Sequence, residues 1–339
     1  MEQHPPFSPS PFTTTTSAGT QQNKQMTQQK TKFLARIISL FLCSAAPVLA
    51  LDPQAIDDAL NQTVVRQEQV LAAQLASPFP SSGLWRHEDY ALAAYGLNQQ
   101  TATADAELIA LPTNGLYTDA IAGGKFHWHA YLQERIYFLY SAQSAYFPGR
   151  MSTATENAIL QMLWDWAAPN CKIGMASPDK IHFYWGSENH HAQAWVSFWG
   201  AAHIFKDHPA YQNLTYADGS TPAEMAAAFD AYFKAFVRER SSKGLLVEVA
   251  SPTYAKYSLN TWYNLADFAS DPELKAAAGA LLDIYWADWA MEQIDGVRGG
   301  SRHRSYAGVA SIESGGGSAA TAWYHFGKGK EANKHPGVM

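Results

Sequence analysis

Residues 184–191 read Tyr184-Trp185-Gly186-Ser187-Glu188-Asn189-His190-His191. An apolar run follows as far as Phe205, and its spacing predicts a helix over 188–205 whose first turn carries a carboxylate, an amide and two imidazoles. The free backbone N–H groups and the dipole at a helix start favour an anion. This turn can therefore hold a carboxylate and move a proton beside it.

A purely structural interpretation of the same turn stays open. Ser187 or Asn189 would then cap the helix, and both histidines would be partly buried at the edge of a loop. Neighbouring residues on a helix point about 100° apart, so His190 and His191 cannot both face one ligand. We predict that His190 faces the pocket and that His191 lies behind it or in the core.

Helical spacing continues through most of the chain and predicts a mostly α fold. About eight helices are expected, at 53–75, 87–97, 128–146, 152–168, 188–205, 221–240, 257–269 and 272–293. The strand candidates are 244–249 and 182–185. Helices that alternate with polar, aromatic loops predict antiparallel hairpins around an axis, an (α/α) toroid. Such toroids need about six or seven hairpins. Because about four are expected here, the toroid should be incomplete in this chain.

The first 50 residues are expected to lie outside the fold. Residues 1–25 are rich in Pro, Thr and Gln, which is typical of disorder. Three basic residues then precede an apolar run over 37–50, the pattern of a signal peptide cleaved near Ala50. The run is too short to span a bilayer. Met26 is the expected start of this signal.

This leader predicts a secreted or periplasmic protein without membrane contact after cleavage. We expect one toroid domain over 51–326 and an irregular tail over 327–339, where the chain looks truncated. Of the two cysteines, Cys43 falls in the signal, so Cys171 alone remains, which excludes an internal disulfide and a cysteine zinc site.

The charge balance limits the partners. The first 50 residues hold four of the 24 Lys and Arg and one of the 30 Asp and Glu, so the remaining chain has a net charge of −9. An acidic protein of this kind is not expected to bind nucleic acid. The chain also has 11 Trp and 17 Tyr. Most should pack in a helical core, and some can stack sugar rings in a cleft.

Two further stretches carry groups suited to an acidic ligand. Tyr254 is expected on a loop before a helix, with Tyr257 as a weaker candidate beside it. Lowering a phenol pKa from about 10 to 8 needs only about 2.7 kcal/mol, which one nearby cation can supply. Residues 298–306 form the basic cluster of the mature chain, where Arg302 and Arg304 can grip a carboxylate. Core packing of Tyr254 and a solvated basic loop are the alternatives.

Phe126-His127-Trp128-His129 opens another expected helix. As a metal site it is weak because no third ligand follows at a telling spacing, so we predict neither a metal nor another cofactor. His127 and Trp128 are instead predicted to form a sugar-stacking rim. The sequence has neither a Gly-x-Ser-x-Gly elbow nor a P-loop, which removes the serine hydrolase and NTPase classes.

Taken together, these motifs resemble the secreted α/α-toroid polysaccharide lyases that act on alginate, glucuronan or chondroitin. The resemblance covers most of 80–325 and is carried by Ser187-Glu188-Asn189-His190, a downstream Tyr254, and Gly-Gly-x-Arg-x-Arg-x-Tyr over 299–306. The family's alginate lyases have an Arg shortly before the Tyr. Here the nearest upstream charge is Glu248, which puts the arginine assignment in doubt.

The resemblance implies a lyase that cleaves a uronate polysaccharide by β-elimination. Asn189 would neutralise the carboxylate, His190 would neutralise it or act as base, Tyr254 would be the acid or both acid and base, and Arg302 would bind the carboxylate or a neighbouring sugar. The remaining expected substrate contacts are Trp128, His127, Arg304, Glu188, His191 and Tyr257.

Two rival functions stay open at this point. One is a toroid glycoside hydrolase that uses Glu188 with Asp89 or another carboxylate, which requires two carboxyl groups roughly 5–10 Å apart. The other is a secreted sugar-binding protein without turnover.

Overall fold

The computed structural model describes residues 52–76, 86–248, 251, 254–298 and 316–328. The leader expected over 1–50 lies outside this part of the chain, and so do Arg302, Arg304 and the tail from residue 329. The elements discussed below lie in one compact unit from Asp57 to Met339, except for the first turn of the first helix. None of the described helices is both long and apolar enough to cross a membrane.

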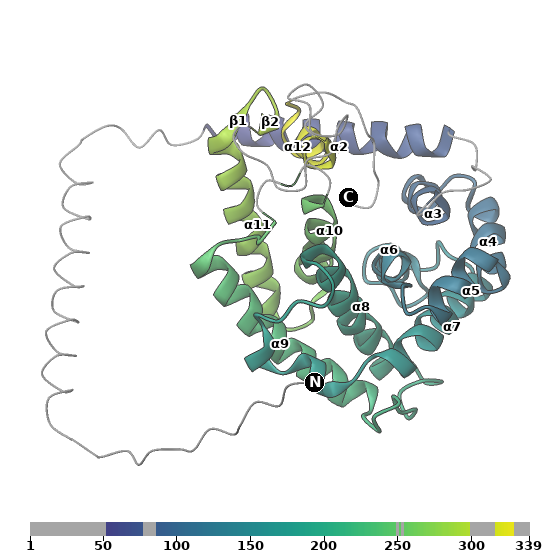
Figure 1. Ribbon diagram of the computed structural model, residues 1–339. Helices are drawn as coiled ribbons and strands as arrows, with labels where there is room; N and C mark the ends of the chain where they lie inside the picture. Colours follow the sequence, from purple (N-terminus) through teal and green to yellow (C-terminus); the bar gives the residue numbers. More distant parts are fainter. Residues whose placement is uncertain (1–51, 77–85, 249–250, 252–253, 299–315, 329–339) are drawn as a thin grey trace, which may run out of the picture. The chain divides into compact units, whose positions relative to one another are not determined.

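The described residues are mostly α-helical, which confirms the predicted class (Figure 1). The helices are α2 (Pro53–Ala76), α3 (Arg86–Leu97), α4 (Thr101–Ala110), α5 (Gly115–Ala122), α6 (His127–Tyr140), α7 (Thr153–Asn170), α8 (Glu188–Asp207), α9 (Pro222–Lys243), α10 (Ala255–Phe268), α11 (Pro272–Glu292) and α12 (Gly316–Phe326). Short 3₁₀ turns cover Leu111–Thr113, Ile173–Ala176 and Pro178–Lys180. Strands β1 (Gln293–Ile294) and β2 (Val297–Arg298) form a small antiparallel hairpin.

The helix predicted over 128–146 was too long, because α6 ends at Tyr140. The hydroxyl of Ser144 donates to the backbone carbonyls of Phe138 and Leu139, both at 2.7 Å. These carbonyls would otherwise accept from the next helical turn, so the side chain replaces that turn and ends the helix. The loop that follows is therefore held by specific hydrogen bonds.

Both predicted strands were wrong. In the 182–185 stretch the N–H of Trp185 donates to His191 Nδ1 at 3.2 Å, and Gly186 then turns the chain with a φ of 69°. In the second stretch the N–H groups of Val247 and Glu248 donate to the Glu188 carboxylate at 2.9 and 2.8 Å. Side chains of α8 thus satisfy the donors that a neighbouring strand would have used.

The helices pack in a regular succession. Along the chain, α3 contacts α6, α6 contacts α8, α8 contacts α10, and α10 contacts α12. The intervening helices pack outside these: α4 contacts α3 and α7, α9 contacts α8, and α11 contacts both α9 and α10. Consecutive pairs such as α3–α4, α8–α9 and α10–α11 are therefore helical hairpins.

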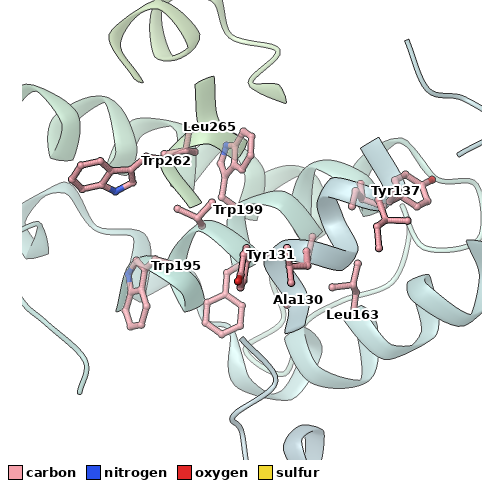
Figure 2. Close-up of a cluster of buried hydrophobic side chains, with 14 of the residues drawn as sticks. Ala130, Tyr131, Tyr137, Leu163, Trp195, Trp199, Trp262 and Leu265 are labelled. Atoms are coloured by element: carbon pink, nitrogen blue, oxygen red, sulfur yellow. The ribbon is translucent and has the colours of Figure 1, made fainter. Parts of the chain in front are cut away.

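The core lies between these helices and is strongly aromatic. Figure 2 shows Trp195, Trp199, Tyr131, Trp262 and Leu265 gathered where α6, α8 and α10 meet. Trp199 and Trp262 have at most 1% of their surface exposed. Such side chains bury roughly 150–250 Å² each, so they contribute several kcal/mol apiece to holding the three helices together.

The central helices α6, α8 and α10 run in the same direction. His127 at the start of α6 contacts His190 at the start of α8, and Glu134 further along α6 lies against Gly200 further along α8. Likewise Trp128 contacts Tyr257 near the start of α10, whereas the later residue Arg135 reaches Asp267 near its end. Their N-terminal ends therefore meet at one end of the bundle.

Candidate functional site

Two imidazoles face each other where α6 and α8 begin. His127 Nε2 lies 2.9 Å from His190 Nδ1, so one nitrogen donates and the other accepts. Burial, followed by the neighbouring His190, lowers the pKa of His127 to about 3. His127 is therefore neutral near pH 7. It fixes the ring of the half-buried His190, the histidine predicted to face the pocket.

An aromatic wall joins this pair to α10. The ring of Trp128 meets His190 edge to face at 4.6 Å between centroids and meets Tyr257 in the same way at 5.7 Å. The ring of Tyr254, just before α10, lies 6.3 Å from that of Tyr257. Residues predicted from three distant stretches of sequence are thus brought together: His127, Trp128, His190, Tyr254 and Tyr257.

Several buried polar groups at this end have incomplete hydrogen bonding. The side-chain oxygen of Asn189 makes no hydrogen bond within the described part of the chain, and the Tyr131 hydroxyl and the Asn260 amide, which face each other, leave part of their hydrogen-bonding capacity unused. Each such group costs about 1–3 kcal/mol if nothing satisfies it. They are therefore positions where a ligand or ordered water would complete the bonding.

The amide of Asn189 can present a donor. Its nitrogen donates to the Ser187 hydroxyl at 3.1 Å, and a hydroxyl can donate as well as accept. The two ends of an amide are interchangeable in such an arrangement, so the NH₂ group can take the other side. Asn189 is 1% exposed at the start of α8, so its amide is shielded from water.

A buried acid and a buried base complete this end. Burial raises the pKa of Asp89, at the start of α3, well above its usual range, and Glu88 raises it further, while Lys256 and Arg86 act the other way. Burial also lowers the pKa of Lys256, which the charge of Asp89 opposes. The Lys256 ammonium lies 4.8 Å from the centre of the Tyr257 ring.

These surroundings set the protonation of Tyr257. Burial, followed by the charges of Tyr254 and Asp89, raises the pKa of Tyr257 to about 12. At neutral pH this side chain is therefore an intact phenol that can donate a proton, not a phenolate that can accept one.

In the structure, Glu188 and His191 form hydrogen bonds that hold the fold. The carboxylate of Glu188 accepts from two backbone N–H groups and ties the segment before α10 to α8. His191 is 2% exposed, accepts from the Trp185 N–H at Nδ1 and pairs through Nε2 with the Tyr232 hydroxyl at 2.9 Å. Both of its ring nitrogens are therefore used inside the fold, and burial lowers its pKa to about 3.

Sequence reasoning overlooked two of the groups at this end. Tyr131 follows Trp128 by three residues, and Asn260 follows Tyr257 by three. On a helix this spacing puts both members of each pair on one face, so the rule that places i and i+3 together would have found them. Asp89 was considered as one carboxylate of a hydrolase.

The basic cluster is described only in part. Arg298, its first residue, lies on β2 and pairs with Asp288 at 2.7 Å and with Glu292 at 2.6 Å. Arg302 and Arg304 lie outside the described residues. Within the described residues, no group of three or more His, Cys, Asp or Glu is arranged to hold a metal ion.

Comparison with known proteins does not add to this geometry: no protein-family model, no curated protein and no solved structure matches the chain.

Proposed function

We propose that the chain is a polysaccharide lyase that cleaves a uronic-acid-containing polysaccharide, with alginate or glucuronan favoured, by β-elimination. The observation that carries this proposal is the run of ring contacts from His190 through Trp128 and Tyr257 to Tyr254 at the N-terminal ends of α6, α8 and α10, with the buried amide of Asn189 next to His190 in sequence. In β-elimination a base removes the proton on C5, the C4–O bond breaks, an acid protonates the departing oxygen, and a C4=C5 double bond forms.

The first requirement of this chemistry is to neutralise the uronate carboxylate, which otherwise resists further negative charge. Hydrogen-bond donors aimed at the carboxylate in a site that excludes water do this. Asn189 and His190 take this role, and His190 can instead act as the base. The N-terminal ends of parallel helices add partial positive charge at the same place.

The second requirement is an acid beside the glycosidic oxygen. Tyr254 is assigned this role and can also serve as the base. Tyr257 beside it stays a protonated phenol, and because burial raises its pKa to about 12 it is a weaker acid than a free phenol. Arg302 and Arg304 are taken from the basic cluster of the sequence, and the family resemblance adds to the case for Arg302; they would bind the carboxylate or a neighbouring sugar. Trp128 and His127 form the rim on which sugar rings stack.

The remaining parts of the proposal concern architecture and setting. The succession of α3, α6, α8, α10 and α12, with α4, α9 and α11 outside, supports the inner and outer layers of an incomplete (α/α) toroid. The substrate is the expected partner of a secreted or periplasmic protein, and the reaction as written uses no cofactor.

The hydrolase alternative loses support from one contact. Both oxygens of Glu188 accept backbone N–H groups, so this carboxyl group is not placed to donate a proton or activate water. Asp89 alone does not provide the pair of carboxyl groups that hydrolysis requires.

The test is to incubate the protein with alginate, glucuronan, hyaluronan and chondroitin and to follow the ultraviolet absorbance of the 4,5-unsaturated end. We expect absorbance to grow with at least one of them. New reducing ends without this absorbance would replace the lyase by a hydrolase, and binding without any new ends would leave a sugar-binding protein.

A further inference from the structure

Two hollows lie at the other end of the same helices. One, of about 430 Å³, is lined by the last turns of α3, α6 and α10 together with α2. The second, of about 680 Å³, is lined by the last turns of α6, α8 and α10. Both volumes are typical of small-molecule sites, for which roughly 300–1,000 Å³ is usual. At 1.5 Å per residue, the 14-residue helices α6 and α10 put these hollows about 20 Å from the candidate lyase site.

The two hollows share Tyr146, Asp267 and Phe268, so they adjoin across the ring of Tyr146. Tyr146 is 46% exposed and its neighbour Phe147 is 42% exposed. The Phe147 ring already packs against the Arg150 guanidinium at 4.3 Å and the Tyr140 ring at 5.9 Å, so Tyr146 is the ring considered for stacking.

The loop that presents these rings is held firmly. The Tyr146 hydroxyl donates to the Asp267 carbonyl at 2.7 Å, and the Phe147 N–H donates to the Leu139 carbonyl at 3.1 Å. The Arg150 guanidinium donates to the carbonyls of Tyr95 and Gly96 at 2.7 and 2.9 Å, which ties the loop to the end of α3. The aromatic platform is therefore formed in advance of any ligand.

Charged side chains also line the hollows: Glu68 lines the first, and Asp207, which pairs with Lys206, and Lys275 line the second. The Arg135 guanidinium lies 2.6 Å from the Asp267 carboxylate and donates to Asn264 at 2.9 Å. Helix C-terminal ends carry partial negative charge, which does not favour an anion. The amide side chains of Gln67 and Gln143 also line the hollows, whereas the Ser144 hydroxyl is already used to hold the loop.

We propose that these adjoining hollows form a binding site for an uncharged saccharide of two or more units, whose rings stack on Tyr146 and occupy the space on either side. Flat apolar rings with a surrounding set of neutral hydrogen-bonding groups match the faces and hydroxyls of such sugars. The site is separate from the lyase site and does not rest on the proposed function, because uncharged sugars lack the carboxylate that β-elimination needs.

The test is calorimetric titration of the full chain with tetrasaccharides of glucose, mannose and N-acetylglucosamine, and with an alginate tetrasaccharide as the charged comparison. We expect at least one uncharged tetrasaccharide to bind, and Tyr146→Ala to weaken it at least tenfold. Trp128→Ala, at the opposite end, should leave this affinity within threefold.

Gln143→Ala is a second variant in case Tyr146→Ala disturbs folding. Gln143 is exposed, so its replacement should leave the fold intact. Its loss should still weaken binding about threefold. The proposal is overturned if no uncharged tetrasaccharide binds at millimolar concentration. It is equally overturned if binding survives both Tyr146→Ala and Gln143→Ala, or if it is lost with Trp128→Ala instead.

Discussion

The two ends of the helices α6, α8 and α10 differ in chemistry although the same helices build both. At the N-terminal end, imidazoles, phenols and incompletely bonded amides surround helix starts that attract anions. At the C-terminal end, the one buried guanidinium described there, Arg135, is held by Asp267 and Asn264, and exposed aromatic rings stand beside neutral polar groups. Helix direction thus separates a region suited to proton transfer on an acidic sugar from one suited to holding an uncharged sugar.

The largest effect should come from the histidine at the N-terminal end. His190→Ala removes a carboxylate neutraliser or base, and loss of such a group costs about 10²–10⁴-fold in turnover. Its neighbour provides the matched control, since His191→Gln should change stability and leave kcat within about fivefold. The measurement is the initial rate of absorbance increase with the preferred polymer. Equal losses in both variants would contradict the assignment of different roles to the two histidines.

At the C-terminal end, the main expected effect is on stability. Arg135→Met leaves Asp267 and Asn264 without their partner. Because Asp267 is 39% exposed, we expect a loss of about 2–3 kcal/mol in unfolding free energy, below the range for fully buried pairs. The exposed pair of Lys206 with Asp207 is the control, and Lys206→Met should cost less than about 0.5 kcal/mol. Urea denaturation measures both. If Arg135→Met lost turnover while keeping full stability, this would contradict the claim that the C-terminal end of these helices takes no part in the reaction at the N-terminal end.

The buried histidines predict how stability changes with pH. The folded-state pKa values of His127 and His191 are about 3, below the value of about 6.5 expected when unfolded. The unfolded chain therefore binds more protons as pH falls below 6.5, and folding loses up to about 1.4 kcal/mol per pH unit for each histidine until pH 3. Urea denaturation at pH 7.0 and 5.5 should show a smaller difference for His191→Gln than for the unmodified protein. An unchanged difference would show that His191 does not titrate in this way.

The smallest effect is expected at Glu188. Glu188→Gln replaces one of two acceptors for the backbone N–H groups of Val247 and Glu248, which should cost about 1 kcal/mol. Turnover should fall less than tenfold, through loosening of the segment that leads to Tyr254. The same rate assay decides the matter, since a thousandfold drop would show that Glu188 takes part directly in the elimination and does more than hold this segment.

Much of the helical framework could be predicted because long amphipathic segments carry their own spacing. The helix α8 begins at Glu188 as expected, since a polar turn precedes an apolar run there. Shorter elements were missed: α4 and α5 have only ten and eight residues, too few for a clear period. The strand candidate at 244–249 failed because its N–H groups are satisfied by a side chain from a distant helix, which local sequence does not record.

The residues of the candidate site could likewise be predicted only in part. His127, Trp128, His190 and Tyr254 stand at junctions between loops and helices, where sequence reasoning looks for chemistry. Residues one turn further in resemble core residues and were passed over. His191 and Glu188 have side chains that could act on a substrate. Only their hydrogen bonds in the folded chain show that both hold the fold.

The most direct test of the central claim, that Tyr254 acts with His190 on one uronate, is to measure turnover and substrate affinity together in Tyr254→Phe. This change removes one hydroxyl and keeps the ring that lies beside Tyr257. The account predicts that production of the unsaturated end falls at least 100-fold while the affinity for the same polymer stays within about threefold. Unchanged production of the unsaturated end in this variant would contradict the account.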